Sequence, residues 1–206
     1  MTQSNNLETE VKFLLSNPMR VEDRLLRSSG KLIQPKTHEI NYRLDSQDLR
    51  MRSENKVLRL RKDSTSWLTF KEPGSILDGI CIREELEIPI GDIQTAIKLF
   101  AAIGFHIEQI YEKYRTIYRL NDVFVMIDEL SIGNYVELEG NSPDQIKKVA
   151  KFLGLIWDRH IQIGYLQIHN KLSKLDGKQI DNMLFKSKFS TIKDLEKLNI
   201  LPADNG

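Results

Sequence analysis

The chain has 206 residues, and its 30 Lys plus Arg nearly balance its 29 Asp plus Glu, which leaves a formal net charge of +1. This balance gives no global field for nucleic acid or an anionic membrane, and no apolar run approaches the roughly 18 residues of a membrane span. One cysteine excludes an internal disulfide framework. With 40% hydrophobic residues and no signal-peptide core at its polar N-terminus, the sequence predicts a folded, cytoplasmic protein built around one domain.

Most of the chain shows the period-two alternation that places successive side chains on opposite faces of a β-strand. The expected strands, in chain order, are residues 7–15, 38–44, 57–62, 67–71, 80–90, 110–120, 123–130 and 135–139. Apolar residues at helical spacing predict three amphipathic helices, which start near Pro18, Asp92 and Ser142 and end before a glycine. Two more helices are expected at 161–172 and 191–198, and residues 73–79 are expected to form a loop.

Charged residues recur on one face of these strands, mostly as pairs two residues apart. In the first strand, Glu8, Glu10 and Lys12 alternate with Val11 and Phe13. Seven basic residues follow this pattern: Lys12, Arg59, Arg61, Lys71, Arg83, Lys113 and Arg115. Seven acidic residues also follow it: Glu8, Glu10, Glu85, Glu87, Asp128, Glu137 and Glu139. One such strand alone is typical of a solvated sheet face, but the repetition across strands favours a shared role.

The opposite face of the same strands is apolar and suits packing under the three amphipathic helices. We therefore expect helices outside a curved sheet and charges on its inner face. If the sheet closes, those charges meet in a polar lumen. Charges cannot be gathered there dry and unpaired, so the pattern predicts charged ligands: a polyphosphate for the cations and a divalent metal for the carboxylates.

These residues fall in segments that resemble the CYTH superfamily of triphosphate tunnel enzymes. Residues 7–12, LETEVK, are similar to its ExExK signature. The other similar segments follow in the family's order at residues 42–45, 58–61, 69–71, 83–87, 111–115, 127–129 and 135–140. The resemblance covers about residues 5 to 170, and it implies a tunnel domain at 1–172 followed by a partly helical extension at 173–206 whose role stays open.

The resemblance implies an α+β fold in which eight antiparallel strands close into a β-barrel, or tunnel, with helices packed outside. A triphosphate would bind inside with Mg²⁺ or Mn²⁺. The implied phosphate-binding residues are Lys12, Arg59, Arg61, Lys71, Arg83, Lys113 and Arg115. The implied metal ligands are Glu8, Glu10, Asp128, Glu137 and Glu139, and the implied catalytic residues are Glu8, Glu10, Lys12 and Glu139. For Glu85 and Glu87, orienting the nearby arginines is favoured over holding a second metal.

Three functions are compatible with these residues. The leading hypothesis is metal-dependent hydrolysis of a small-molecule triphosphate, either inorganic triphosphate, thiamine triphosphate or a nucleoside triphosphate. A class IV adenylate cyclase, which converts ATP to cyclic AMP and pyrophosphate, would share the binding residues and differ in the attacking oxygen. A non-catalytic polyphosphate-binding module is the third, although simple binding would not need so many carboxylates. No nucleic acid or membrane partner is expected, and the sequence leaves a homodimer open.

Overall fold

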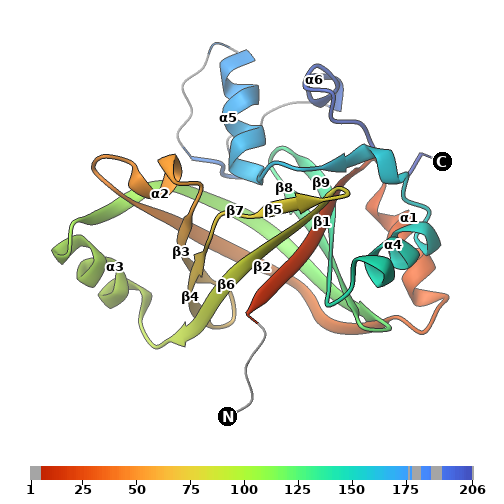
Figure 1. Ribbon diagram of the computed structural model, residues 1–206, viewed down its shortest axis with the longest axis horizontal. Coiled ribbons are helices and arrows are strands. Elements are labelled where there is room, and N and C mark those ends of the chain that lie inside the picture. Colours follow the sequence, from red (N-terminus) through yellow and green to blue (C-terminus); the bar gives the residue numbers. More distant parts are fainter. Residues whose placement is uncertain (1–5, 176, 178–181, 187–191, 206) are drawn as a thin grey trace.

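A computed structural model describes residues 6–175, 177, 182–186 and 192–205, and its central feature is a closed ring of antiparallel strands (Figure 1). Eight strands form the ring, and the pairing of β6 with β1 closes it. In ring order the strands are β1 (Leu7–Leu15), β9 (Gly133–Gly140), β8 (Val123–Leu130), β7 (Phe105–Leu120), β2 (Lys31–Ser46), β3 (Val57–Lys62), β4 (Ser66–Lys71) and β6 (Ile80–Ile90). The sequence therefore predicted the closed antiparallel architecture correctly.

The ring departs from a regular barrel at β1. Along one edge of β1, the first half, Leu7 to Glu10, pairs with β6. The second half pairs along that edge with β10 (His160–Ile161) through Lys12 and Phe13. A further short strand, β5 (Ser75–Leu77), lies beside β6 in the segment that was expected to be a loop.

Strand β2 is much longer than its predicted core of 38–44. It runs for 16 residues and pairs with β7 through three register shifts, one of which lies between Gln34 and Thr37 and contains Pro35. Bulges bend a strand and increase its twist, and proline is tolerated there because it has no N–H to donate to the ladder. The bulges thus help the two longest strands to curve around the ring.

Helices cover the outer face of the ring, as expected. Helices α1 (Pro18–Leu26) and α4 (Pro143–Phe152) bury Val21, Leu25 and Ile146 in a core that includes Val11 of β1. On another side, α3 (Ile93–Ala102) packs near α2 (Arg50–Ser53) over the outer faces of β2 and β3 (Figure 1). No helix among the described residues is long and apolar enough to cross a membrane.

Helix α5 (Tyr165–Leu175) packs against one end of the ring (Figure 1). It starts later than the predicted 161–172 because β10 and the 3₁₀ turn η1 (Trp157–Arg159) occupy the preceding residues. Its Tyr165 and Ile168 pack with Leu14 and Tyr135, which lie on the same strand faces as the charged residues. The charged face therefore becomes apolar where α5 covers it.

The last described residues are part of the same core. Helix α6 (Ile192–Glu196) contributes Leu195 to the cluster around α5, and the expected first residue of this helix, at position 191, lies outside the described residues. Ala203 is fully buried, and its N–H donates to the carbonyl of Leu14 over 2.8 Å. The carboxylate of Asp204 accepts from the backbone N–H groups of Ser16 and Asn17, each at 2.7 Å, just before α1. The C-terminal segment thus fastens β1 to α1.

We expect Asp204→Ala to lower the free energy of unfolding by about 2 kcal/mol, because two partly buried N–H groups lose a charged acceptor. Chemical denaturation followed by circular dichroism measures this change. Asp122→Ala is the matched control, since Asp122 forms an exposed ion pair with Arg119 and should change stability by less than about 0.5 kcal/mol. Equal losses in the two variants would contradict the anchoring role of Asp204.

Candidate active site

The charged residues that the sequence singles out surround one cavity of about 690 Å³ inside the ring. Asp128 is the exception, since it is fully buried behind the cavity wall. The residues that line the cavity are Glu8, Glu10, Lys12, Arg59, Arg61, Lys71, Arg83, Glu85, Glu87, Lys113, Arg115, Glu137 and Glu139. These residues come from six of the eight ring strands, and Asp128 comes from a seventh, β8, so the predicted charged inner face is present.

Strand register explains most of the charge pairing in the cavity. Glu8 lies opposite Arg83 across the β1–β6 pair, and Lys12 lies opposite Glu137 across the β1–β9 pair. Side chains directly opposite each other in antiparallel strands are close enough to interact, and opposite charges there are stabilising. Glu10 and Glu139 form the exception in this part of the ring, because two carboxylates face each other.

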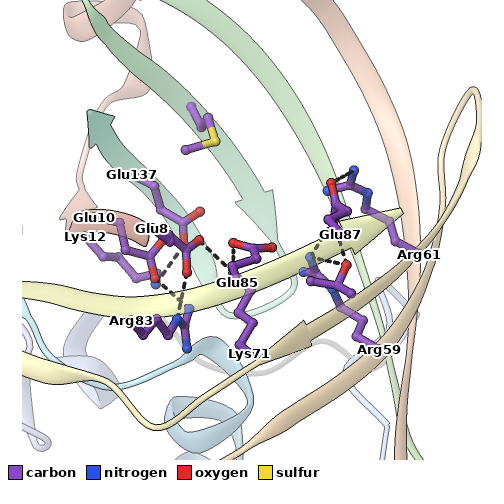
Figure 2. A network of polar contacts seen from close by, with 12 residues as sticks. Glu8, Glu10, Lys12, Arg59, Arg61, Lys71, Arg83, Glu85, Glu87 and Glu137 are labelled. Atoms are coloured by element: carbon purple, nitrogen blue, oxygen red, sulfur yellow. Dashed lines mark hydrogen bonds and ion pairs between the residues drawn. The ribbon is translucent and has the colours of Figure 1, made fainter. Parts of the chain in front are cut away.

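Glu8 joins two cations on neighbouring strands (Figure 2). One carboxylate oxygen accepts from Nζ of Lys71, and the other from Nε of Arg83, both at 2.7 Å. Arg83 also reaches Oε1 of Glu10 at 3.0 Å, and Lys71 lies 3.0 Å from Glu85. These contacts hold both cations beside the cavity, and Glu85 contacts a lysine in place of the arginines that it was expected to orient.

Asp128 is the centre of a second, more deeply buried group. Nε and Nη2 of Arg115 donate to its two oxygens at 2.6 Å each, which is the bidentate geometry that guanidinium groups favour. Nζ of Lys113 and the hydroxyl of Tyr165 also donate to Oδ2 of Asp128, at 3.1 and 2.9 Å. With every oxygen of Asp128 engaged by a donor, the geometry favours positioning of Arg115 and Lys113 over metal binding.

Glu137 is similarly engaged. It lies 2.7 Å from Nζ of Lys12 and also contacts Nη2 of Arg115. Burial opposes charge on Lys12, but Glu137 and Glu10 together raise the pKa of its ammonium above the ordinary value. The Lys12 ammonium also lies 4.4 Å from the centre of the Tyr165 ring, a favourable cation–π distance. Lys12 is therefore a fixed cation at the end of the cavity.

A third group lies on β3, β4 and β6 (Figure 2). Glu87 is 3.2 Å from Nη2 of Arg61 and 3.7 Å from Nη2 of Arg59, and it accepts from the Thr69 hydroxyl at 2.6 Å. Nη1 of Arg59 donates to the Tyr111 hydroxyl at 3.2 Å. Glu87 thus orients two arginines, as the sequence favoured.

Several inner-face residues escaped the sequence analysis. Glu39 is 2% exposed and lies 3.5 Å from Lys113. Burial alone would raise its pKa, but Lys113 and Arg115 lower the pKa of Glu39 to about 2. Arg43 also lines the cavity. Both alternate with apolar Ile40 and Leu44, a signal at period two that was present in the sequence but interrupted by the polar residues before it.

Glu139 differs from the other carboxylates because it forms no hydrogen bond or ion pair with any described residue. Burial and the nearby Glu8 and Glu10 raise the pKa of Glu139 to about 7. The described residues contain no ready-made group of three or more His, Cys, Asp or Glu donors. Mg²⁺, however, commonly takes only one or two protein carboxylates and completes its shell with water and phosphate oxygens. Glu10 and Glu139 fit that requirement.

The raised pKa of Glu139 predicts a pH-dependent stability. An unfolded glutamate loses its proton near pH 4.3, whereas the folded protein retains it to about pH 7. Between these values the folded state binds more protons, so the free energy of unfolding should fall with rising pH, by roughly 3 to 4 kcal/mol in all. In the variant Glu139→Gln, measured in EDTA, the free energy of unfolding should lack this decrease between about pH 4.3 and pH 7. Identical pH profiles for the two proteins in denaturant titrations would refute it.

Comparison with known proteins gives the family. Residues 6–167 match the model of the CYTH domain. A Methanocaldococcus jannaschii protein provisionally named an adenylate cyclase is 28% identical over 174 residues, which cover 79% of this chain and 98% of that protein. The solved structure of a conserved hypothetical protein from Pyrococcus furiosus is 27% identical, has a TM-score of 0.64, and matches over 78% of this chain and 98% of its own.

A structure from Hippeastrum, described as an adenylyl cyclase candidate with a dominant triphosphatase activity, shares the fold. Its TM-score is 0.62 at 17% identity, with 84% of this chain and 97% of that chain covered. The charged inner face and the family match over most of the chain lead to one conclusion: the protein belongs to the CYTH domain family.

Proposed function

We propose that this protein is a metal-dependent triphosphatase that hydrolyses its substrate in the tunnel formed by the ring. One observation carries the proposal: in a cavity whose other charges are mostly paired, Glu139 lies beside Glu8 and Glu10 and forms no ion pair with a described residue. Such a carboxylate lacks a positive partner that a divalent metal would supply. The triphosphatase activity described for the Hippeastrum relative supports the same reaction class.

Glu10 and Glu139 would hold Mg²⁺ or Mn²⁺, with Glu8 beside them. When bound, the cation supplies charge neutralisation at phosphate oxygens and lowers the pKa of coordinated water. Asp128 and Glu137, which the sequence also suggested as ligands, instead keep Arg115, Lys113 and Lys12 in place in this proposal. The tunnel domain at 1–172 would supply the site, and the extension at 173–206 would brace its end.

The basic residues would bind and orient the phosphate chain. Lys71 and Arg83 each contact a carboxylate at the cavity surface and retain donors that point at no described acceptor. Phosphoryl transfer needs positioning and charge stabilisation more than a covalent nucleophile. Lys12, held by Glu137 and the Tyr165 ring, would stabilise negative charge on the departing phosphate. Glu8 would keep Arg83 and Lys71 directed at the substrate.

We expect Glu139→Gln and Glu10→Gln to lower phosphate release from tripolyphosphate by at least about 100-fold, because each removes a charged oxygen from the metal position. Tripolyphosphate binding should persist in both variants. Glu129→Gln is the matched control, since Glu129 forms an exposed ion pair with Lys36, and its rate should stay within twofold. Assays with Mg²⁺ and then Mn²⁺ should include thiamine triphosphate and ATP. The proposal fails if the wild-type protein releases phosphate from none of them.

Adenylate cyclase activity is the second candidate, and the name of the Methanocaldococcus relative favours it. The same cations would then hold ATP, while the ribose 3′-hydroxyl in place of water would attack the α-phosphorus. Product analysis of the ATP reaction separates the two. Cyclic AMP with pyrophosphate would replace the triphosphatase assignment, whereas ADP with phosphate would support it. Binding of tripolyphosphate without turnover or metal dependence would leave the polyphosphate-binding module.

A further inference from the structure

Arg43 is a cation of the cavity that the sequence analysis did not identify. It lies on the inner face of β2, directly opposite Arg59 of β3 in the strand register. Like charges opposite each other on neighbouring strands are destabilising. The protein nevertheless places these two guanidinium groups side by side on a partly buried wall, so some other contact must offset their repulsion.

The protein itself supplies Arg43 with little compensation. Its only hydrogen bond among the described residues runs from Nη2 to the carbonyl of Lys56 at 3.3 Å, and its buried Nε has no partner. Every other lysine or arginine that lines the cavity forms an ion pair with a described carboxylate, whereas Arg43 forms none. Arg43 is thus the point of greatest unmatched positive charge in the cavity wall.

The nearby carboxylates are committed elsewhere. Asp45 accepts the backbone N–H groups of Met51 and Arg52, at 2.8 and 3.0 Å, at the start of α2. Glu108 lies 2.8 Å from the guanidinium of Arg52. Burial lowers the pKa of Arg43, and the charge of Arg59 adds to the decrease. A guanidinium in this position is matched only when an anion approaches from the cavity.

Unused donors gather around the same place. Asn41 lies two residues before Arg43 on the same face of β2, fully buried behind the cavity lining, and neither atom of its side-chain amide has a partner among the described residues. Nε of Arg59 is also buried and unpartnered. Buried polar groups are nearly always hydrogen-bonded in native proteins. The donors of Arg43 and Arg59, which both line the cavity, match the several oxygens of a phosphoryl group, which arginine binds in a forked geometry.

The ring order places this cluster across the cavity from the proposed metal position. β2 is the fourth strand from β1 in both directions around the ring, and β3 is likewise opposite β9. Arg43 and Arg59 therefore face the Glu10–Glu139 pair from the far wall. A linear phosphate chain that reaches both walls would contact the carboxylates through a bound metal ion and the guanidinium groups by direct hydrogen bonds.

We propose that Arg43, with Arg59, forms an anion subsite that binds a phosphoryl group of the substrate remote from the Glu10–Glu139 pair. The inference deepens the proposed function by assigning the far end of the substrate to Arg43. It makes Arg43 a binding residue that favours substrates with a free phosphoryl group at that end.

The test is binding of tripolyphosphate in EDTA, measured by isothermal titration calorimetry on the full chain. Arg43→Gln should weaken binding about tenfold to 100-fold, as expected for the loss of a charged, two-pronged hydrogen bond. The affinity of Arg43→Lys should fall between those of wild type and Arg43→Gln, because lysine keeps the positive charge but cannot donate two parallel hydrogen bonds. Arg50→Gln is the control, since Arg50 is exposed on α2 and paired with Glu54, and its affinity should stay within twofold of wild type.

Thermal unfolding without ligand separates binding from a structural role. Because Arg43 is an unmatched charge in the empty cavity, Arg43→Gln should unfold at the same or a higher temperature while losing affinity. Affinity within twofold of wild type, or a drop in unfolding temperature together with affinity, overturns the subsite. The binding assay needs neither metal nor turnover. A protein without triphosphatase activity whose tripolyphosphate binding depends on Arg43 would refute the triphosphatase proposal alone. An active protein whose binding is unchanged in Arg43→Gln would refute the subsite alone.

Discussion

The burial of many opposite charges inside a closed ring is the constraint on which the rest of this structure depends. Removing a carboxylate or an ammonium from water costs several kcal/mol, and the cost is recovered only when partners and geometry are both good. Asp128 meets that condition with four donated hydrogen bonds from three side chains. A shift of one residue in register would turn such a strand over and bring its charges under the helices, so the charged interior also fixes the strand pairing.

The same constraint explains why the C-terminal part of the chain packs where it does. An open ring would let water reach the buried ion pairs from both ends. Helix α5 covers one end with apolar side chains, and its Tyr165 also contacts the charged interior through Asp128 and the ammonium groups of Lys12 and Lys113. One residue thereby joins the outer helical layer to the cavity, so the end closure and the electrostatics of the interior are physically coupled.

Charge is distributed unevenly around the ring, with a pair of facing carboxylates on one wall and a pair of facing guanidinium groups on the opposite wall. The carboxylate of Glu139 on β9 forms no ion pair with a described residue, and it faces Glu10 on β1. The guanidinium of Arg43 on β2 also forms no ion pair with a described carboxylate, and it faces Arg59 on β3, across the ring from β1 and β9. Like charges that face each other destabilise the ligand-free fold. A metal ion at the carboxylates and an anion at the guanidinium groups would remove this repulsion. The two like-charge pairs are therefore the positions at which this ring departs from what stability alone favours.

The sequence by itself determined which residues face inward on the regular strands. The alternation of Glu8, Glu10 and Lys12 with apolar residues is a local property, because a pleated strand sends neighbouring side chains to opposite faces. Glu39 and Arg43 follow the same alternation, but they lie four positions apart with the uncharged Asn41 between them, so they did not stand out as a charged pair. Only the tertiary structure decided which charges meet: Lys71 and Glu8 are 63 positions apart, and their contact requires the ring to close through β6 and β1. Local periodicity fixes the face of a side chain, whereas ring closure and register fix its partner.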